Sequence, residues 1–323
     1  MATGEIVAGK TTKKPKSMKI IGLFMACFVI AALIVTGILY FNVYLPQSKG
    51  PAGSDVPAEP FKHIWSEKKV LLLGIGDDIT SDSGVKEGFS YFQRLVRNPS
   101  GDSRDMPGKN LSSVFPNLTN TNTASSWSTS INHLEGLTMA RIYPQDVYGI
   151  IVITTGLNEL LHSYGKESPN ERAMYGVTVE QAVPWMDNFQ KRINEMIKFI
   201  VYIFPGGCRI FIANIYDPTD GTGFTNAWFA DAPAWPDGLV ILEAYNQIIQ
   251  DCASQYDNVH VIDIHKAFLG HGIHCRKGGL GNDRTGWYQT KSADPTANER
   301  GHDVIRRLFL NEMIKVFYDA NDG

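Results

Sequence analysis

The chain has 323 residues, of which 43% are hydrophobic and 20% are charged, and its formal net charge at pH 7 is −3. This near-neutral balance, with no basic cluster beyond the N-terminal tail, argues against nucleic acid as a partner. The four cysteines are scattered and show no Cys-x-x-Cys or Cys/His spacing, so we expect neither a metal site nor another cofactor.

The first 45 residues predict a single-pass membrane anchor. Residues 1–19 form a tail with five lysines that only one glutamate opposes. Residues 20–45 carry no formal charge, and a helix needs roughly 20 such residues to cross a bilayer. The lysines place the N-terminus in the cytoplasm and the domain outside it, in the periplasm if the source is bacterial. A cleaved signal peptide is the alternative, but its apolar region is only roughly 7 to 15 residues long and ends in a small-x-small site. Here the run ends in bulky residues, which favours an uncleaved signal anchor.

Residues 46–61 are rich in Pro, Gly, Ser and Ala and predict a linker. Residues 62–323, about 260 in number, suffice for one large α/β domain with a substantial core. Short apolar runs alternate there with helical patterns. We predict strands at 69–76, 118–124, 147–155, 208–216 and 260–264, and helices at 88–97, within 179–203, and at 239–256 and 298–319. The alternation predicts a parallel sheet with helices on both faces, whose ligands bind beyond the carboxyl ends of the strands.

Two of these strands end in loops that bear Gly and acidic residues. Gly76-Asp77-Asp78 follows the first predicted strand, and Gly156-Leu157-Asn158-Glu159 follows the third. Together they resemble the first and third sequence blocks of the SGNH/GDSL hydrolases, a family of serine esterases and lipases whose blocks read GDS and GxND. The resemblance covers roughly residues 70–317. It implies the three-layer, flavodoxin-like, doubly wound parallel α/β fold of that family.

In that family the nucleophilic serine stands where this chain has Asp78. An ionised carboxylate cannot replace a hydroxyl that a base deprotonates, and attack of an aspartate on an ester would give an acyl anhydride. Asp78 is therefore either a reactive or ligand-contacting carboxylate, or it caps the following helix through backbone N–H groups. Ser81 and Ser83 lie further along the loop and are weak substitutes.

Residues 122–130 fit the spacing of the family's second block, N-x-A-x-S-G-x-T-S, whose glycine N–H helps to form the oxyanion hole. The glycine position falls on Trp127. A backbone N–H persists there, but an indole is expected to crowd the space that an ester needs and to oppose the backbone conformation of a glycine. A misalignment by one or two residues in this loop is the alternative.

The third block is the best kept, with Glu159 as a conservative replacement of the family's Asp. The resemblance implies that the side-chain amide of Asn158 donates a hydrogen bond to the oxyanion. By itself, an Asn after a strand is usually only a turn residue.

The family's last block, D-x-x-H-P, completes the triad before the C-terminal helix. Residues 293–302 keep the Pro, Asn and Gly landmarks but have no His before the Pro. Asp294 occupies that His position or, on a shifted alignment, the position of the triad Asp, with Ala297 where the His belongs. His302 lies within the helical pattern, where we expect a surface or packing role.

Two further histidines, His271 and His274, lie in the Gly-rich loop after the fifth predicted strand. Such a loop can bring an imidazole over the site as a general base. The alternative is that both side chains are hydrogen-bonded parts of the loop structure.

Three other features have both a functional and a structural interpretation. Asp217 and Asp220, together with Asp77 and Asp78, suit a cation site, although their spacing is not that of a calcium loop and turn chemistry explains Asp-Pro and Asp-Gly adequately. An aromatic loop suits either a lid over a ligand or a packed cover of the sheet edge; it contains Trp228, Phe229 and Trp235. Buried or free thiols are favoured over a disulfide among Cys208, Cys252 and Cys275.

Of the family's four signature positions, only Asn158 is kept. Loss of triad members removes several powers of ten in rate. The sequence therefore predicts a membrane-anchored SGNH-like protein without serine-esterase activity, which keeps its cleft to bind a small molecule, an acylated glycan or a lipid of the envelope. The alternative is an active ester hydrolase with a remodelled site that uses Asp78, Asn158 and His271 or His274. A Ser–His pair in contact near Asp78 is the observation that would favour a working catalyst.

Overall fold

The computed structural model describes residues 16–39, 53–226, 231–272, 286–289 and 295–321. The chain divides into two units, residues 1–47 and residues 48–323. The first unit contains helix α1 (Lys16–Leu39), on which apolar side chains such as Phe28 and Leu33 are exposed. Within the described part of the chain, no helix has the length and apolar character needed to span a membrane. Residues 40–45 of the predicted anchor lie outside the described part.

The second unit is built on a five-stranded sheet in which every neighbouring pair of strands is parallel. Its order is β2-β1-β3-β4-β5, which is the flavodoxin-like order of a doubly wound sheet. The strands are β1 (Lys69–Gly76), β2 (Leu118–Asn122), β3 (Val147–Thr154), β4 (Cys208–Ala213) and β5 (Val259–Ile262). The parallel α/β fold predicted from the sequence is thus confirmed, and β1 has the predicted bounds.

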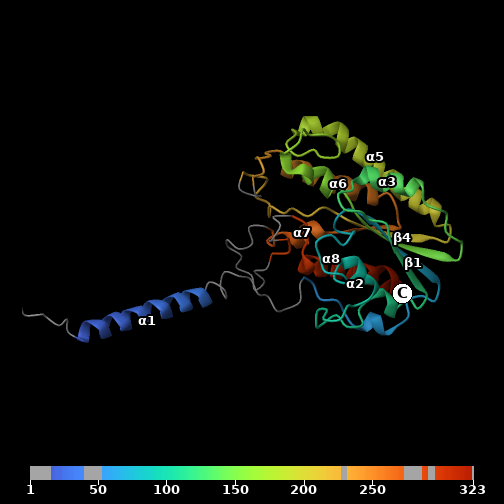
Figure 1. Ribbon diagram of the computed structural model, residues 1–323. Helices are drawn as coiled ribbons and strands as arrows, with labels where there is room; N and C mark the ends of the chain where they lie inside the picture. The colour runs from blue at the N-terminus through green and yellow to red at the C-terminus, as the bar shows by residue number, and fades with distance from the viewer. Residues whose placement is uncertain (1–15, 40–52, 227–230, 273–285, 290–294, 322–323) are drawn as a thin grey trace, which may run out of the picture. The chain divides into compact units, whose positions relative to one another are not determined.

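Helices cover both faces of the sheet (Figure 1). One layer consists of α3 (Ser130–Thr138), α5 (Val179–Ile203) and α6 (Gly238–Ala253). The other contains α2 (Tyr91–Val96) and α8 (Glu299–Phe317), with α7 (Ile264–Phe268) against α8. The remaining helical turns are α4 (Leu157–Leu161), η2 (Glu59–Lys62), η3 (Leu111–Ser113), η4 (His162–Gly165) and η6 (Asp319–Asn321). The sequence patterns did not predict α3, α4 or α7, which are all short.

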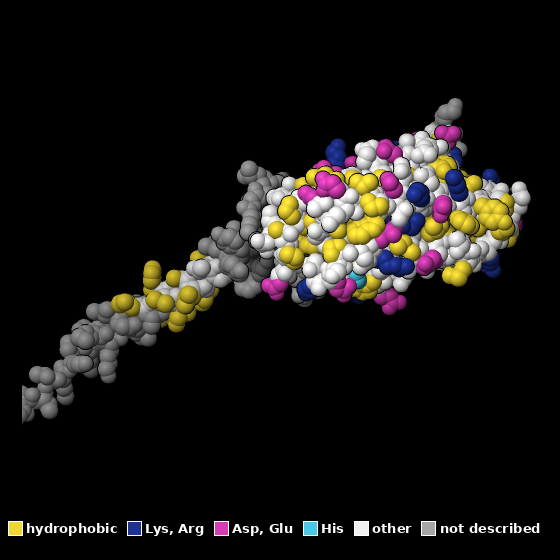
Figure 2. Space-filling view, turned by 90° about the horizontal axis from the view of Figure 1, so that it is seen from above, with side chains coloured by type: hydrophobic (Ala, Val, Ile, Leu, Met, Phe, Trp, Pro, Cys, Tyr) yellow, Lys and Arg dark blue, Asp and Glu magenta, His cyan; other side chains and the backbone are white. Residues whose placement is uncertain are grey.

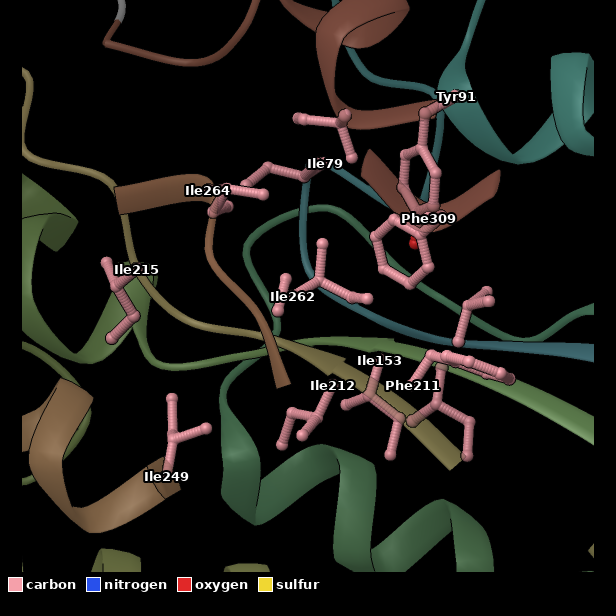
Figure 3. Packing of buried hydrophobic residues seen from close by; sticks show 14 of the residues in the cluster. Ile79, Tyr91, Ile153, Phe211, Ile212, Ile215, Ile249, Ile262, Ile264 and Phe309 are labelled. Carbon is pink, nitrogen blue, oxygen red and sulfur yellow. The ribbon is translucent and has the colours of Figure 1, made fainter. Parts of the chain in front are cut away.

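The core forms where the two helical layers meet the central strands. Seven residues of β1 and six of β3 are buried, as expected for strands covered on both faces. Figure 3 shows Ile249 of α6 and the Tyr91–Phe309 pair of α2 and α8 with the strand residues Ile153 and Phe211. On the face seen in Figure 2, acidic and basic side chains are interspersed among hydrophobic ones.

The strand order determines where a ligand site belongs. The chain leaves β1 toward β2 on one side and then returns to β3 on the other side. The crevice at the carboxyl ends of β1 and β3 is therefore the topological switch point, where ligands bind in open α/β sheets. Gly76 ends β1 and pairs in register with Thr154, the last residue of β3, so the two predicted motifs emerge side by side.

Candidate functional site

The side chain of Asp78 lies at this switch point and is only 5% exposed. One carboxylate oxygen, Oδ2, accepts two hydrogen bonds: from the backbone N–H of Trp127 at 3.0 Å and from Nδ2 of Asn158 at 2.8 Å. Oxyanion holes place their donors about 2.7–3.1 Å from the oxyanion. Asp78 therefore fills, with its own oxygen, a pair of donors that has oxyanion-hole geometry.

Trp127 takes the backbone conformation of a glycine. Its φ is +62°, in the left-handed region, which costs a residue with a Cβ about 1–2 kcal/mol. Trp127 thus adopts a left-handed conformation despite this cost. The indole is 56% exposed and contacts the ring of His162 edge-on, with the ring centroids 5.5 Å apart.

Asn158 is held by α4, which begins directly after Gly156. Gly156 has a φ of +101°, and a Cβ there would stand 2.5 Å from Ile215, so this turn requires glycine. The Asn158 amide donates both to Asp78 and to the backbone carbonyl of Ser128, at 2.9 Å. Its donors are thus fully engaged within the protein.

Asp77 lies beneath the site and is 1% exposed. Its Oδ1 accepts hydrogen bonds from Thr154 Oγ1 at 2.7 Å and from the Ile79 N–H, whereas its Oδ2 is buried without a partner. Burial, together with the neighbouring charges of Asp78 and Glu159, raises the pKa of Asp77 to about 7. Asp77 is thus a structural acid close to the carboxylate that fills the donor pair.

Glu159 anchors the start of α3. Its Oε1 accepts a hydrogen bond from the N–H of Ser130, the first residue of that helix, at 2.6 Å. The side chain is fully buried, and this burial raises its pKa. Arg192, whose charge counters that rise, donates to Ser130 Oγ and also pairs with Glu171. The Glu in place of the family's Asp thus fixes the loop that carries Trp127 and Ser128.

A Ser–His pair that the sequence patterns did not reveal lies next to this site, and it is the kind of contact named above as favouring a working catalyst. Ser128 Oγ is 2.8 Å from Nε2 of His133, and Nδ1 of His133 is 3.0 Å from Thr155 Oγ1. Ser128 and His133 are 8% and 7% exposed, respectively. The sequence feature that could have indicated the helix carrying His133 is its capping box, which is formed by Thr129 and Asn132 at the start of α3.

From the hydrogen bonds around Ser128 we infer that its hydroxyl proton points away from His133. The Ser128 hydroxyl also lies 2.5 Å from the carbonyl of Ser125 and 3.0 Å from that of Gly76. A hydroxyl has one proton, and both carbonyls can only accept, so Ser128 donates to a carbonyl and accepts from Nε2–H of His133. Burial lowers the pKa of His133 to about 4, which keeps it neutral, and a threonine rather than a carboxylate stands behind it.

The loop serines near Asp78 bind one another rather than a base. Ser126 Oγ is hydrogen-bonded to Ser83 and lies 3.1 Å from Ser81 Oγ. Ser81 also donates weakly to the Asp78 carbonyl. These hydroxyls form a polar rim beside Trp127.

The remaining histidines have other contacts. Within the described ranges, the Asp78 carboxylate accepts hydrogen bonds from Trp127 and Asn158 and from no histidine. His271 stacks on Trp287, with the ring centroids 3.5 Å apart. His302 is 1% exposed and accepts from the Tyr91 N–H, so the predicted packing role is confirmed.

Several predicted residues lie outside the described part of the chain. These are His274, Asp294, Cys275, Trp228 and Phe229. Trp235, from the same aromatic loop, is 1% exposed and donates to the Val177 carbonyl, which fits a packed cover. Cys208 and Cys252 are free thiols.

The acidic pair after β4 forms turns. Asp217 accepts from Thr219 and Gly221, and Asp220 accepts from the N–H groups of Gly270 and Gly272. Among the described residues there is no cluster of three His, Cys, Asp or Glu side chains that could hold a metal ion. Turn chemistry accounts for the Asp217 carboxylate, whereas the Asp220 carboxylate joins this loop to the segment that follows α7.

No protein-family model and no curated protein matches the sequence. Solved structures do, and SGNH/GDSL-type acylhydrolases are among them. The chain is similar to the acetylxylan esterase Axe2 from Geobacillus stearothermophilus, with 17% identity over 77% of this chain and 94% of that chain and a TM-score of 0.47. It is also similar to a lipase/acylhydrolase from Enterococcus faecalis, with 15% identity over 76% and 95% of the two chains and a TM-score of 0.46. No conclusion about activity follows from similarity at this level.

Proposed function

We propose that this protein is a membrane-tethered domain that does not hydrolyse esters and that uses the surroundings of its switch point to bind an acylated glycan or lipid. One observation carries the proposal: the Asp78 carboxylate occupies the two donors, from Trp127 and Asn158, that an esterase of this kind would offer to its substrate.

The chemistry of a carboxylate at this position opposes ester hydrolysis in two ways. Asp78 has no hydroxyl to be deprotonated for attack. Its negative charge also stands where the negative charge of a tetrahedral intermediate would develop, and like charges at hydrogen-bonding distance repel strongly in a buried site. The two donors that would stabilise an oxyanion, from Trp127 and Asn158, stabilise the Asp78 side chain instead.

An ester hydrolysis assay tests this proposal. The full chain in detergent is incubated with p-nitrophenyl acetate and butyrate, alongside Asp78→Ala and the isosteric, uncharged Asp78→Asn. We expect all three proteins to release p-nitrophenol at the buffer rate. A wild-type rate above background that disappears in Asp78→Ala would establish the alternative, an active hydrolase with a remodelled site.

The variant Asp78→Ser tests whether a general base lies within hydrogen-bonding distance of a serine at position 78. We expect it to remain at background, because no described histidine is hydrogen-bonded to Asp78. Turnover by Asp78→Ser would show that a histidine such as His271 or His274 can reach this position.

The ligand class is tested by calorimetry with an O-acetylated oligosaccharide and its deacetylated form. The proposal predicts binding of the acetylated form only. Equal binding of the two forms, or of neither, contradicts an acyl ligand.

The membrane tether is supported by the uncharged run 20–45 and the lysines before it. We expect the full chain to resist extraction from membranes by alkaline carbonate, and a chain lacking residues 1–45 to be released. Release of the full chain would contradict the tether. Protease added to intact cells or spheroplasts then tests whether residues 62–323 lie outside the cytoplasm.

A further inference from the structure

A pocket of about 130 Å³ lies between α3 and the strands, separate from the donors that Asp78 fills. Its inner wall is made of buried side chains, among them Leu73 and Ile75 of β1 and Leu137 of α3. Its outer part is formed by exposed or half-exposed residues, among them Ser125, Asn132 and Gly136. No Asp, Glu, Lys or Arg lines it.

The wall next to the switch point is polar but uncharged. The hydroxyl of Ser128 and the imidazole of His133 belong to it, and they satisfy each other as described above. Burial keeps His133 neutral at pH 7, because it lowers the pKa to about 4. An ionic ligand would lose its hydration here without gaining a partner of opposite charge.

Two donors at the rim are not engaged by other described groups. Asn132 uses its Oδ1 to accept from Thr129 and Arg172, whereas its Nδ2 donates to none of the described residues. The hydroxyl of Ser125 likewise has no described partner, since only the backbone of that residue is hydrogen-bonded. A ligand that lies in the apolar part could present a carbonyl oxygen to these donors.

We propose that this pocket is a binding site for a short, neutral acyl group of about two to four carbons, whose chain lies on Leu73, Ile75 and Leu137 and whose carbonyl faces Ser125 and Asn132. The size fits, since an apolar cavity of about 150 Å³ in another protein binds benzene. The site is distinct from the Asp78 donors, and the proposal does not depend on whether those donors support hydrolysis.

Gly136 offers a clean way to close the pocket. Gly136 lines the pocket, and a Cβ added at this helical glycine meets no atom within 4 Å, so a larger side chain fits there without a clash. Gly136→Phe is the blocking variant. Gly136→Ala is its matched control, because it makes the same change in the backbone without the bulk.

The test is a titration of the methyl-labelled full chain in detergent with butyramide, followed by NMR of the Leu and Ile methyl groups. We expect saturable shifts of Leu73, Ile75 and Leu137, unchanged in Gly136→Ala, and at least tenfold weaker binding in Gly136→Phe. Butyrate, the charged analogue, is expected to bind at least tenfold more weakly than butyramide.

Two results would overturn the proposal: no saturable shift with butyramide, or equal binding by Gly136→Phe. Gly136→Leu is measured in parallel and keeps the test decisive if the Phe variant does not fold. Ester turnover is read in a separate assay, so the proposed lack of hydrolysis and the proposed pocket can fail independently.

Discussion

The donor pair at Asp78 and the pocket under α3 lie next to each other and meet at Ser128. The carbonyl of Ser128 accepts from Asn158 on one side, while its hydroxyl contacts His133 on the other. The donor pair binds the charged carboxylate of Asp78, which is almost completely buried. The pocket is uncharged, open at its rim and has unengaged donors.

The loop that contains Trp127 and Ser128 thus borders a charged environment on one side and a neutral one on the other. A buried carboxylate is tolerated only if hydrogen bonds replace its lost hydration, so the donors around Asp78 are not free for another task. Neutral groups have no such demand, and Ser128, His133 and Thr155 satisfy one another and leave the pocket open. Ligand binding is therefore more plausible on the neutral side than at the position where an esterase would have its nucleophile.

Asp77 gives the largest expected effect on the charged side. Its pKa is raised from 3.8 to about 7, so the folded state holds a proton that the unfolded state has lost, and stability falls as pH rises through this window. Relative to Asp77→Asn, we expect wild type to lose about 4 kcal/mol of unfolding free energy between pH 4 and pH 8. Urea titrations of both proteins across this range measure it. A difference that does not change with pH would show that Asp77 is ionised normally.

Asn158→Leu removes a donor from Asp78 while leaving its charge buried. We expect a loss of about 3 kcal/mol in unfolding free energy, measured by urea denaturation at pH 7. The double variant Asp78→Ala/Asn158→Leu is the control, since without the carboxylate the Leu should cost clearly less. Additive effects of the two changes would mean that the hydrogen bond contributes no coupling.

His133 tests the neutral side. Its pKa is lowered from 6.5 to about 4, so the unfolded state binds the proton first, and stability is lost as pH falls below 6.5. Relative to His133→Gln, wild type should lose about 2 kcal/mol between pH 7 and pH 5. His302 titrates in the same sense, since burial lowers its pKa to about 3, and His302→Gln is therefore measured as the comparison. Parallel pH profiles of wild type and His133→Gln would contradict a neutral buried imidazole.

Trp127→Gly gives the smallest effect and concerns the loop that both regions share. Glycine adopts a φ of +62° without the steric cost of a Cβ, so we expect a gain of about 1 kcal/mol or less. Thermal unfolding measures this gain. Trp127→Ala is the control, because it removes the indole but keeps the Cβ, and it should not show the gain.

The local motifs predicted much of the charged side. Gly76-Asp77-Asp78 and Gly156-Leu157-Asn158 each follow an apolar strand, and parallel pairing brings the ends of such strands together. The family resemblance assigned Trp127 to a glycine position, and the φ of Trp127 is +62°. The roles of these residues in binding or catalysis remain predictions.

The neutral side could not be found in this way. Helix α3 has only nine residues with a glycine among them, so its hydrophobic period is too weak to predict a helix. Without that helix, the direction of the His133 side chain cannot be predicted, and its contact with Thr155 joins two segments that are 22 residues apart. The histidines singled out in the sequence, His271 and His274, were chosen for their loop composition, which does not encode distance.

The sequence by itself determined the parallel α/β architecture, the Gly-bearing ends of two strands and the presence of Asp78 at one of them. Alternating apolar runs, Gly-bearing strand ends and residue identity are all local properties, and they can be read without coordinates. Only the tertiary structure decided that the Asp78 carboxylate occupies the donors of Trp127 and Asn158 and that an uncharged pocket lies beside them. Hydrogen bonds between distant segments depend on distances of a few tenths of an ångström, which packing sets and no local pattern records.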